Sequence, residues 1–151
     1  MTITSPAFDH GQKIPVEYSC KGADISPALE WSGVPEGAVS FALICVDPDA
    51  PIGTWVHWVY FNIPPDLSGL PKAFPGGAEP ETGGFQGRNS WKRNEYGGPC
   101  PPGGTHRYFF KLYALDTTLD LGPRTNKNNL LKAMAGHVLA EAELMGTFAK
   151  K

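Results

Sequence analysis

The stretch that decides the fold is Val39-Ser-Phe-Ala-Leu-Ile-Cys-Val46, which starts in alternation and then becomes almost continuously apolar. This pattern predicts a β-strand buried on both faces, and it ends abruptly at Asp47-Pro48. A second run, Trp55-Val-His-Trp-Val-Tyr-Phe-Asn62, is rich in aromatic and β-branched residues and stops before Pro64-Pro65. A third, Arg107-Tyr-Phe-Phe-Lys-Leu-Tyr-Ala-Leu115, alternates as a half-buried strand does. We expect these three strands to form the centre of a sheet in a mainly β protein.

The rest of the chain predicts long loops, one helix and a last strand. Ser68 to Gly104 is dense in Gly, Pro, Asn and Glu, so we expect loop over most of its length, and loops this long usually carry function. Asn126 to Ala135 has apolar residues at helical spacing and Gly136 as a stop, which predicts a helix. From Val138 to Phe148 the propensities fit either a continued helix or a strand. We favour a short turn and then a strand over Leu144 to Phe148.

The bulk properties predict one domain that spans residues 1–151. A chain of 151 residues with 41% hydrophobic content is long enough for one well-buried core and too short to divide comfortably into two. Its 18 glycines and 15 prolines are scattered among the apolar runs, which indicates many turns between short strands. The formal charge of −2 gives no global field that would attract nucleic acid or an anionic membrane. Any anion binding must therefore be local.

The sequence predicts neither a membrane span nor a disulfide framework. No apolar stretch approaches the roughly 20 residues that cross a bilayer, and Met1 to His10 lacks the basic start and apolar segment of a signal peptide. We therefore expect a cytoplasmic protein. Cysteines Cys20, Cys45 and Cys100 are odd in number and have no CxxC spacing, so neither a disulfide framework nor a zinc site is indicated. Cys45 lies in the first apolar run and is expected to be a buried thiol.

Candidate binding residues follow the first strand. Asp47-Pro48-Asp49-Ala50-Pro51 places carboxylates two residues apart, each followed closely by a proline that fixes the backbone. Such rigidity suits a site, but taken alone the motif is more typical of a turn in which aspartates cap backbone amides. Trp55 and His57 share one face of the next strand, since side chains two apart in a strand point the same way. Together they are candidates for a pocket wall, although a histidine among aromatic residues is more often structural.

A second group of candidates lies in Tyr96-Gly-Gly-Pro-Cys-Pro-Pro-Gly-Gly-Thr-His-Arg-Tyr108. Glycines let backbone amides approach a ligand closely, and prolines hold the shape of the loop. An ordinary Gly/Pro connection does not explain why His106 and Tyr108 follow at same-face spacing. Arg107 points to the opposite face, where we expect it to pair with a loop carbonyl or carboxylate.

Together these pieces resemble the phosphatidylethanolamine-binding protein family, which includes the Raf kinase inhibitor proteins. The resemblance covers nearly the whole chain in order and rests on Ile25-Ser-Pro-Ala-Leu-Glu-Trp31, Asp47 to Pro51, Trp55 with His57, Pro-Cys-Pro-Pro-Gly-Gly from Pro99 to Gly104, His106-Arg-Tyr108 and Gly136-His-Val-Leu-Ala-Glu-Ala-Glu-Leu144. The combination is highly specific although each piece is not. The size of the chain and its GGPCPPGG-like loop look most similar to the prokaryotic branch.

The resemblance implies an antiparallel β-sandwich with a C-terminal helix and a cavity for phosphate-like groups and small anions. It implies that Asp47, Asp49, His57, His106 and Tyr108 line this cavity, with Trp55 and the backbone of Cys100 and Pro101 at its rim. It also implies a cis bond at Ala50-Pro51.

We therefore expect a binding protein and not an enzyme, with no cofactor and no metal. Its partner would be a small phosphate-like anion: a phospholipid headgroup, a nucleotide or a phosphorylated side chain. A protein partner such as a kinase, as in animal relatives, and a homodimer stay among the partners considered.

An anion site that contains two aspartates needs an explanation, because a carboxylate repels phosphate. The hypothesis is that neighbouring charge and partial burial keep one of Asp47 and Asp49 protonated, so that it donates to a ligand oxygen, while His57 and His106 supply further donors. The alternative function is a hydrolase, in which these residues serve acid/base or metal-assisted hydrolysis of an ester or phosphoester. Against it, no serine or cysteine has an obvious base partner in a recognised motif.

Overall fold

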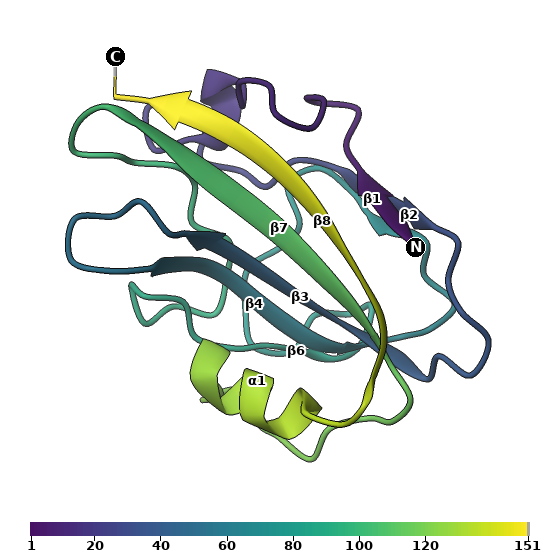
Figure 1. Ribbon diagram of the computed structural model, residues 1–151. Helices are drawn as coiled ribbons and strands as arrows, with labels where there is room; N and C mark the ends of the chain where they lie inside the picture. Colours follow the sequence, from purple (N-terminus) through teal and green to yellow (C-terminus); the bar gives the residue numbers. More distant parts are fainter. Residues whose placement is uncertain (151) are drawn as a thin grey trace.

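The main layer is a five-stranded antiparallel sheet in the order β6-β4-β3-β7-β8 (Figure 1). The computed structural model describes residues 1–150. The strands of this sheet are β3 (Ser40–Asp47), β4 (Trp55–Ile63), β6 (Phe85–Gln86), β7 (Thr105–Leu115) and β8 (Val138–Ala149). The three strands that the sequence predicts form its centre. Every residue of β3 is buried, which confirms that this strand is covered on both faces.

A smaller antiparallel sheet and a helix cover the two faces of the main sheet. The small sheet has the order β1-β2-β5, with strands β1 (Thr2–Thr4), β2 (Leu29–Ser32) and β5 (Gly69–Leu70). Its apolar residues share one core with Leu43 and Cys45 of β3. Leu130 of the helix α1 (Lys127–Met134) shares a second core with Ile44. Because adjacent residues of β3 enter different cores, the two cores lie on opposite faces of the sheet, and the predicted β-sandwich is confirmed.

The C-terminal part contains the predicted helix and a longer strand than predicted. α1 begins after Asn126, whose side chain accepts a hydrogen bond from the backbone N–H of Asn129, and Gly136 follows its end with a φ of +83°. β8 starts at Val138, before the predicted strand, because it pairs with β7 over the whole length of both. This pairing overrides the helical propensity of its first half. Within residues 1–150 no helix has the length and apolar character needed to cross a membrane.

Two expectations about covalent geometry are wrong. Cys20 and Cys100 form a disulfide, with their Cα atoms 5.4 Å apart, although the odd number of cysteines indicated no framework. The bridge ties the loop after the 3₁₀ turn η1 (Val16–Tyr18) to the Pro/Gly-rich loop before β7. All peptide bonds within residues 1–150 are trans, so Ala50-Pro51 lacks the cis bond that the family resemblance implies. The expectation for Cys45 is confirmed: it is a free, buried thiol.

Replacing both Cys20 and Cys100 by Ser is expected to lower the free energy of unfolding by about 4 kcal/mol, because the bridge joins residues 80 apart and restricts the unfolded chain. Urea unfolding of the wild type and the double variant, each with and without reductant, measures this. Reductant should destabilise only the wild type. An equal effect of reductant on both proteins would contradict the pairing.

Candidate functional site

A cavity of about 400 Å³ lies at the end of the sheet where β3 ends and β4 and β7 begin. These three chain ends meet because β3 is antiparallel to both of its neighbours. The cavity, here called the Asp47 pocket, is lined by Asp47, Ala50, Pro51, Ile52, Trp55, His57, Trp91, Cys100, Pro101, Pro102, His106 and Tyr108. Seven of the eight candidate residues from the sequence are among them, and Asp49 is the exception.

Asp47 and His106 form a buried pair in the wall of the pocket. The Nδ1 atom of His106 lies 2.6 Å from Oδ2 of Asp47, and Oδ1 of Asp47 accepts the backbone N–H of Asp49 at 2.8 Å. Both carboxylate oxygens therefore accept N–H groups. Since Nδ1 of His106 donates to the carboxylate, Nε2 is the ring atom left for a ligand. This arrangement makes Asp47 a poor candidate for the protonated donor of the hypothesis.

Tyr108 brings an unused hydroxyl to the pocket. Its side chain is buried, and among the described residues its Oη atom has no hydrogen-bond partner. Burial, and then the charge of Asp47, raise the pKa of Tyr108 well above its usual value, because both disfavour a phenolate. The group therefore stays an O–H donor at physiological pH. Leaving such a group unpaired costs stability, so a native structure that keeps one calls for an explanation.

His57 is held as a neutral ring in the wall of the pocket. Its Nδ1–H donates to the carbonyl oxygen of Gly97 at 2.7 Å, and its ring packs edge-on against Trp91 and Tyr108 at 5.1 and 5.2 Å. Burial lowers the pKa of His57, because a charged imidazole is poorly solvated there. The single N–H of a neutral imidazole is thus used by Gly97. The expectation that His57 donates to a ligand does not fit this geometry.

Asp49 lies outside the pocket lining and pairs with Arg107. One carboxylate oxygen accepts the backbone N–H and the Nε–H of Arg107, both at 2.9 Å, and the other accepts a guanidinium N–H at 2.8 Å. These bonds lower the pKa of Asp49 to about 2, so this residue is ionised and is not the protonated donor. The prediction that Arg107 pairs with a loop carbonyl or carboxylate is confirmed. The pair joins the β3–β4 loop to the start of β7.

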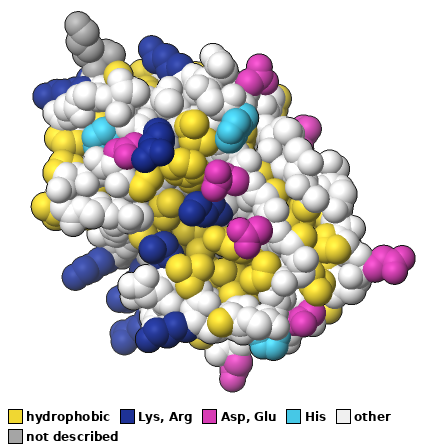
Figure 2. Space-filling model, viewed as in Figure 1, with side chains coloured by type: hydrophobic (Ala, Val, Ile, Leu, Met, Phe, Trp, Pro, Cys, Tyr) yellow, Lys and Arg dark blue, Asp and Glu magenta, His cyan; other side chains and the backbone are white. Residues whose placement is uncertain are grey.

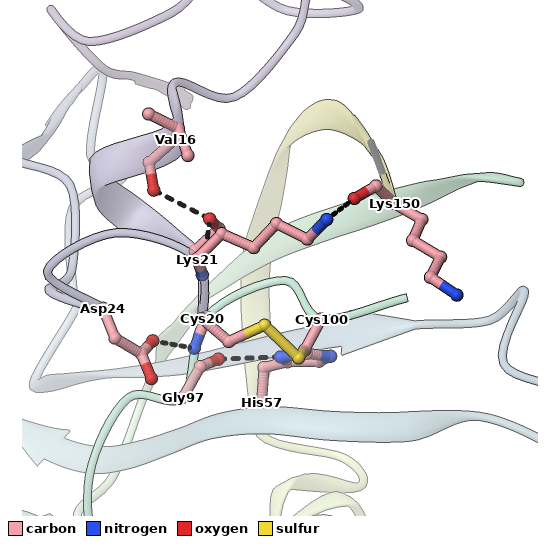
Figure 3. The surroundings of a disulfide bond; sticks show 10 residues. Val16, Cys20, Lys21, Asp24, His57, Gly97, Cys100 and Lys150 are labelled. Carbon is pink, nitrogen blue, oxygen red and sulfur yellow. Dashed lines mark hydrogen bonds between the residues drawn. A yellow bond between two sulfur atoms is a disulfide. The ribbon is translucent and has the colours of Figure 1, made fainter. Parts of the chain in front are cut away.

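The Pro/Gly-rich loop at the rim is anchored to the N-terminal part of the chain (Figure 3). Besides the disulfide, the backbone N–H of Gly98 donates to Asp24 at 2.7 Å, and the N–H of Cys20 donates to the carbonyl of Pro99 at 3.0 Å. Gly97 is required for close packing, since a Cβ there would lie 2.3 Å from the Trp91 ring. The sequence suggested that glycines of this loop let a ligand approach the backbone. The space beside Gly97 is instead filled by the indole ring of Trp91.

Trp91 is the pocket residue that sequence reasoning missed. It comes from the long loop before β7 and packs edge-on against Trp55 at 5.5 Å as well as against His57. The alternation that predicts which side chains of a strand share a face gives no position for Trp91, because this residue lies in a loop. The available signal was its type, because a tryptophan in a stretch otherwise poor in apolar residues needs a packing partner.

Because burial lowers the pKa of His57, the folded protein binds fewer protons than the unfolded chain just below pH 6.5. The contribution of His57 to the free energy of unfolding is therefore fully present above pH 6.5, and it falls as the pH drops from there toward the lowered pKa. We expect His57→Gln to reduce the loss of unfolding free energy between pH 7 and pH 5 seen in urea titrations. An unchanged slope in His57→Gln would count against the neutral ring.

Comparisons with known proteins identify the family to which this chain is similar. Residues 4–149 match the family model described as phosphatidylethanolamine-binding protein. A UPF0098 protein of Methanothermobacter thermautotrophicus is 52% identical over 99% of both chains, and one of Aquifex aeolicus is 46% identical over 99% of this chain and 89% of its own.

Solved structures agree with this match. A phosphatidylethanolamine-binding protein homologue of Chlamydia trachomatis is 44% identical, with a TM-score of 0.90 over 99% of this chain and 97% of its own. E. coli YbcL, described as a new member of the mammalian family, is 34% identical, with a TM-score of 0.91 over 99% and 98% of the two chains. The chain belongs to the phosphatidylethanolamine-binding protein family.

Proposed function

We propose that this chain is a binding protein whose Asp47 pocket takes a small phosphate-like anion. The observation that carries the proposal is the hydroxyl of Tyr108, which is buried, protonated and without a hydrogen-bond partner among the described residues. The ring of His106 stacks beside that of Tyr108, with centroids 6.4 Å apart. An oxygen-rich ligand would supply the acceptor that the hydroxyl lacks.

The Asp47–His106 pair supports an anion in spite of its carboxylate. Both oxygens of the Asp47 carboxylate already accept N–H groups, one from the His106 ring and one from the Asp49 backbone. Asp47 therefore orients the ring so that Nε2 is left to bond a ligand. His57 does not compete, because its N–H is used by Gly97.

The size of the cavity limits the ligand to a small group. About 400 Å³ accommodates a phosphate and a short substituent, and the rim is apolar, with Trp55, Ile52 and Pro101 among its residues. Lipid headgroups, nucleotides and phosphorylated side chains all present such a group. Regulation of a kinase, as in animal relatives, would require contacts beyond the pocket.

Tyr108→Phe separates binding from folding. Removing the hydroxyl should weaken binding of inorganic phosphate by about ten- to a hundredfold, since a hydrogen bond to a charged group contributes about 1.5 to 3 kcal/mol. The same change should leave the free energy of unfolding equal or raise it by about 1 kcal/mol, because an unsatisfied buried group is lost. Calorimetric titration and urea unfolding measure the two effects. Wild-type affinity in Tyr108→Phe would sink the proposal.

Binding should also depend on the ring of His106. His106→Gln should weaken the binding of phosphoethanolamine by about tenfold, because it removes the ring that Asp47 orients, whereas His57→Gln should retain it, because the N–H of His57 is used by Gly97. Phosphoserine peptide and nucleoside monophosphate, titrated in parallel, rank the sources of the phosphate group. An affinity that His106→Gln leaves unchanged would argue against a contact between the ligand and this ring.

The hydrolase alternative is favoured by one observation: an aspartate that orients a histidine and leaves its Nε2 free is also an acid/base arrangement. A covalent route lacks its nucleophile, since the pocket lining contains neither serine nor threonine and Cys100 is bonded to Cys20. Hydrolysis of 4-nitrophenyl phosphate and acetate, with and without divalent metals, tests this alternative. Turnover that disappears in His106→Gln would establish an enzyme, whereas saturable binding without turnover supports the binding protein.

A further inference from the structure

A second polar cavity lies on the opposite face of the main sheet from the Asp47 pocket. It has a volume of about 500 Å³ and lies between the loop that follows β6 and the start of α1. Val56 of β4 lines it, whereas the neighbouring residues Trp55 and His57 line the Asp47 pocket. Because adjacent side chains of a strand point to opposite faces, the two cavities are separated by the sheet.

The walls of this second cavity carry positive charge only. Four of its lining residues, Arg88, Lys92, Arg124 and Lys127, are basic, and none of the lining residues is acidic. The ion pairs found within residues 1–150 involve none of these four. We call this cavity the basic groove. Figure 2 shows Lys and Arg side chains gathered at the lower left, over the end of the molecule where α1 begins.

This concentration of charge is unusual for this chain. The protein has 13 basic and 15 acidic residues and a formal charge of −2, so four cations around one cavity are a local excess that repels itself. Like charges gathered around one cavity repel one another, and a bound counter-charge relieves that repulsion. The residues between them are neutral hydrogen-bonding groups, including Ser90, Asn126 and Asn128. Such a lining suits a ligand with several negative oxygens.

We propose that the basic groove is a second anion site, specific for a small ligand that carries a multiply charged phosphate group such as a pyrophosphate. The charge count carries this assignment: one phosphate group, with a charge of about −1.5 to −2, would leave about half of the four positive charges uncompensated, whereas a pyrophosphate group comes close to balancing them. Asn126 already caps α1 by accepting from Asn129, so the basic side chains, and not the helix end, provide the binding. The proposal does not depend on the function of the Asp47 pocket.

Two of these basic residues lie in the loop between β6 and β7, whose backbone is held by hydrogen bonds. The side chain of Asn89 is buried, and its Oδ1 accepts the backbone N–H groups of Trp91 and Arg93 at 2.9 and 3.0 Å. Ser90 accepts the N–H of Val56 at 2.8 Å through its Oγ. These bonds fix the backbone that carries Arg88 and Lys92, so the groove is organised before a ligand binds.

A ¹⁵N-HSQC titration with inorganic pyrophosphate at constant ionic strength tests the proposal. Amide shifts should be largest within residues 88–92 and 124–128, and they should persist in Tyr108→Phe. That variant distinguishes this site from the Asp47 pocket. Arg88→Gln combined with Arg124→Gln should weaken binding by about tenfold or more. Both positions are exposed, and the spectrum itself reports whether the variant folds.

The matched control removes the same charge elsewhere. Lys13→Gln combined with Lys150→Gln alters two exposed positions outside the groove and should leave the affinity unchanged. Equal weakening by the two double variants would show a general charge effect and overturn the site. Shifts confined to the residues of the Asp47 pocket, or tighter binding of a short oligonucleotide than of pyrophosphate, would overturn the assignment as well.

Discussion

The burial of β3 on both faces constrains everything around it. A strand between two neighbours, with a core on each side, has no position where a polar side chain could remain hydrated, and its apolar run ends where the chain leaves the core. Asp47 is the first charged residue after that run. Since β4 and β7 are antiparallel to β3, their first residues must lie beside it. The position of the Asp47 pocket is therefore a consequence of strand order.

The electrostatic role of each group in and beside the pocket follows from its hydrogen-bond partner. Asp49 pairs with the guanidinium of Arg107 and is a fixed anion outside the cavity. Asp47 accepts a hydrogen bond from the imidazole of His106 and orients that ring. His57 has only a carbonyl and remains neutral. This arrangement does not fit the hypothesis that one of the two aspartates donates to a ligand oxygen, because each carboxylate already accepts from N–H donors of its own.

The sequence predicts the central strands, the helix and most of the pocket, because these depend on local patterns. Period-2 alternation places Trp55 with His57 and His106 with Tyr108, and antiparallel order brings the two pairs together. Asp49, which the family resemblance implied in the cavity lining, lies outside it, because its carboxylate pairs with Arg107.

The other features that the sequence did not predict depend on contacts between residues far apart in the chain. The disulfide joins cysteines 80 residues apart, and neither their number nor their spacing indicates which two meet in space. The same holds for Trp91, a loop residue placed by its contacts with Trp55 and His57. The family resemblance implied a cis bond at Ala50-Pro51, whereas this bond is trans. A disulfide also bears on location, because such bonds persist in oxidising compartments and in intracellular proteins of hyperthermophiles.

The loop around Asn89 connects the two faces of the sheet. Its residues alternate in direction, so that Trp91 packs into the wall of the Asp47 pocket while Ser90 and Lys92 line the basic groove. One buried amide side chain holds both sets in place through its bonds to the backbone. This short segment is therefore part of both walls, and any displacement of it changes both. Under the two proposed binding roles, it is the element through which the two cavities would be coupled.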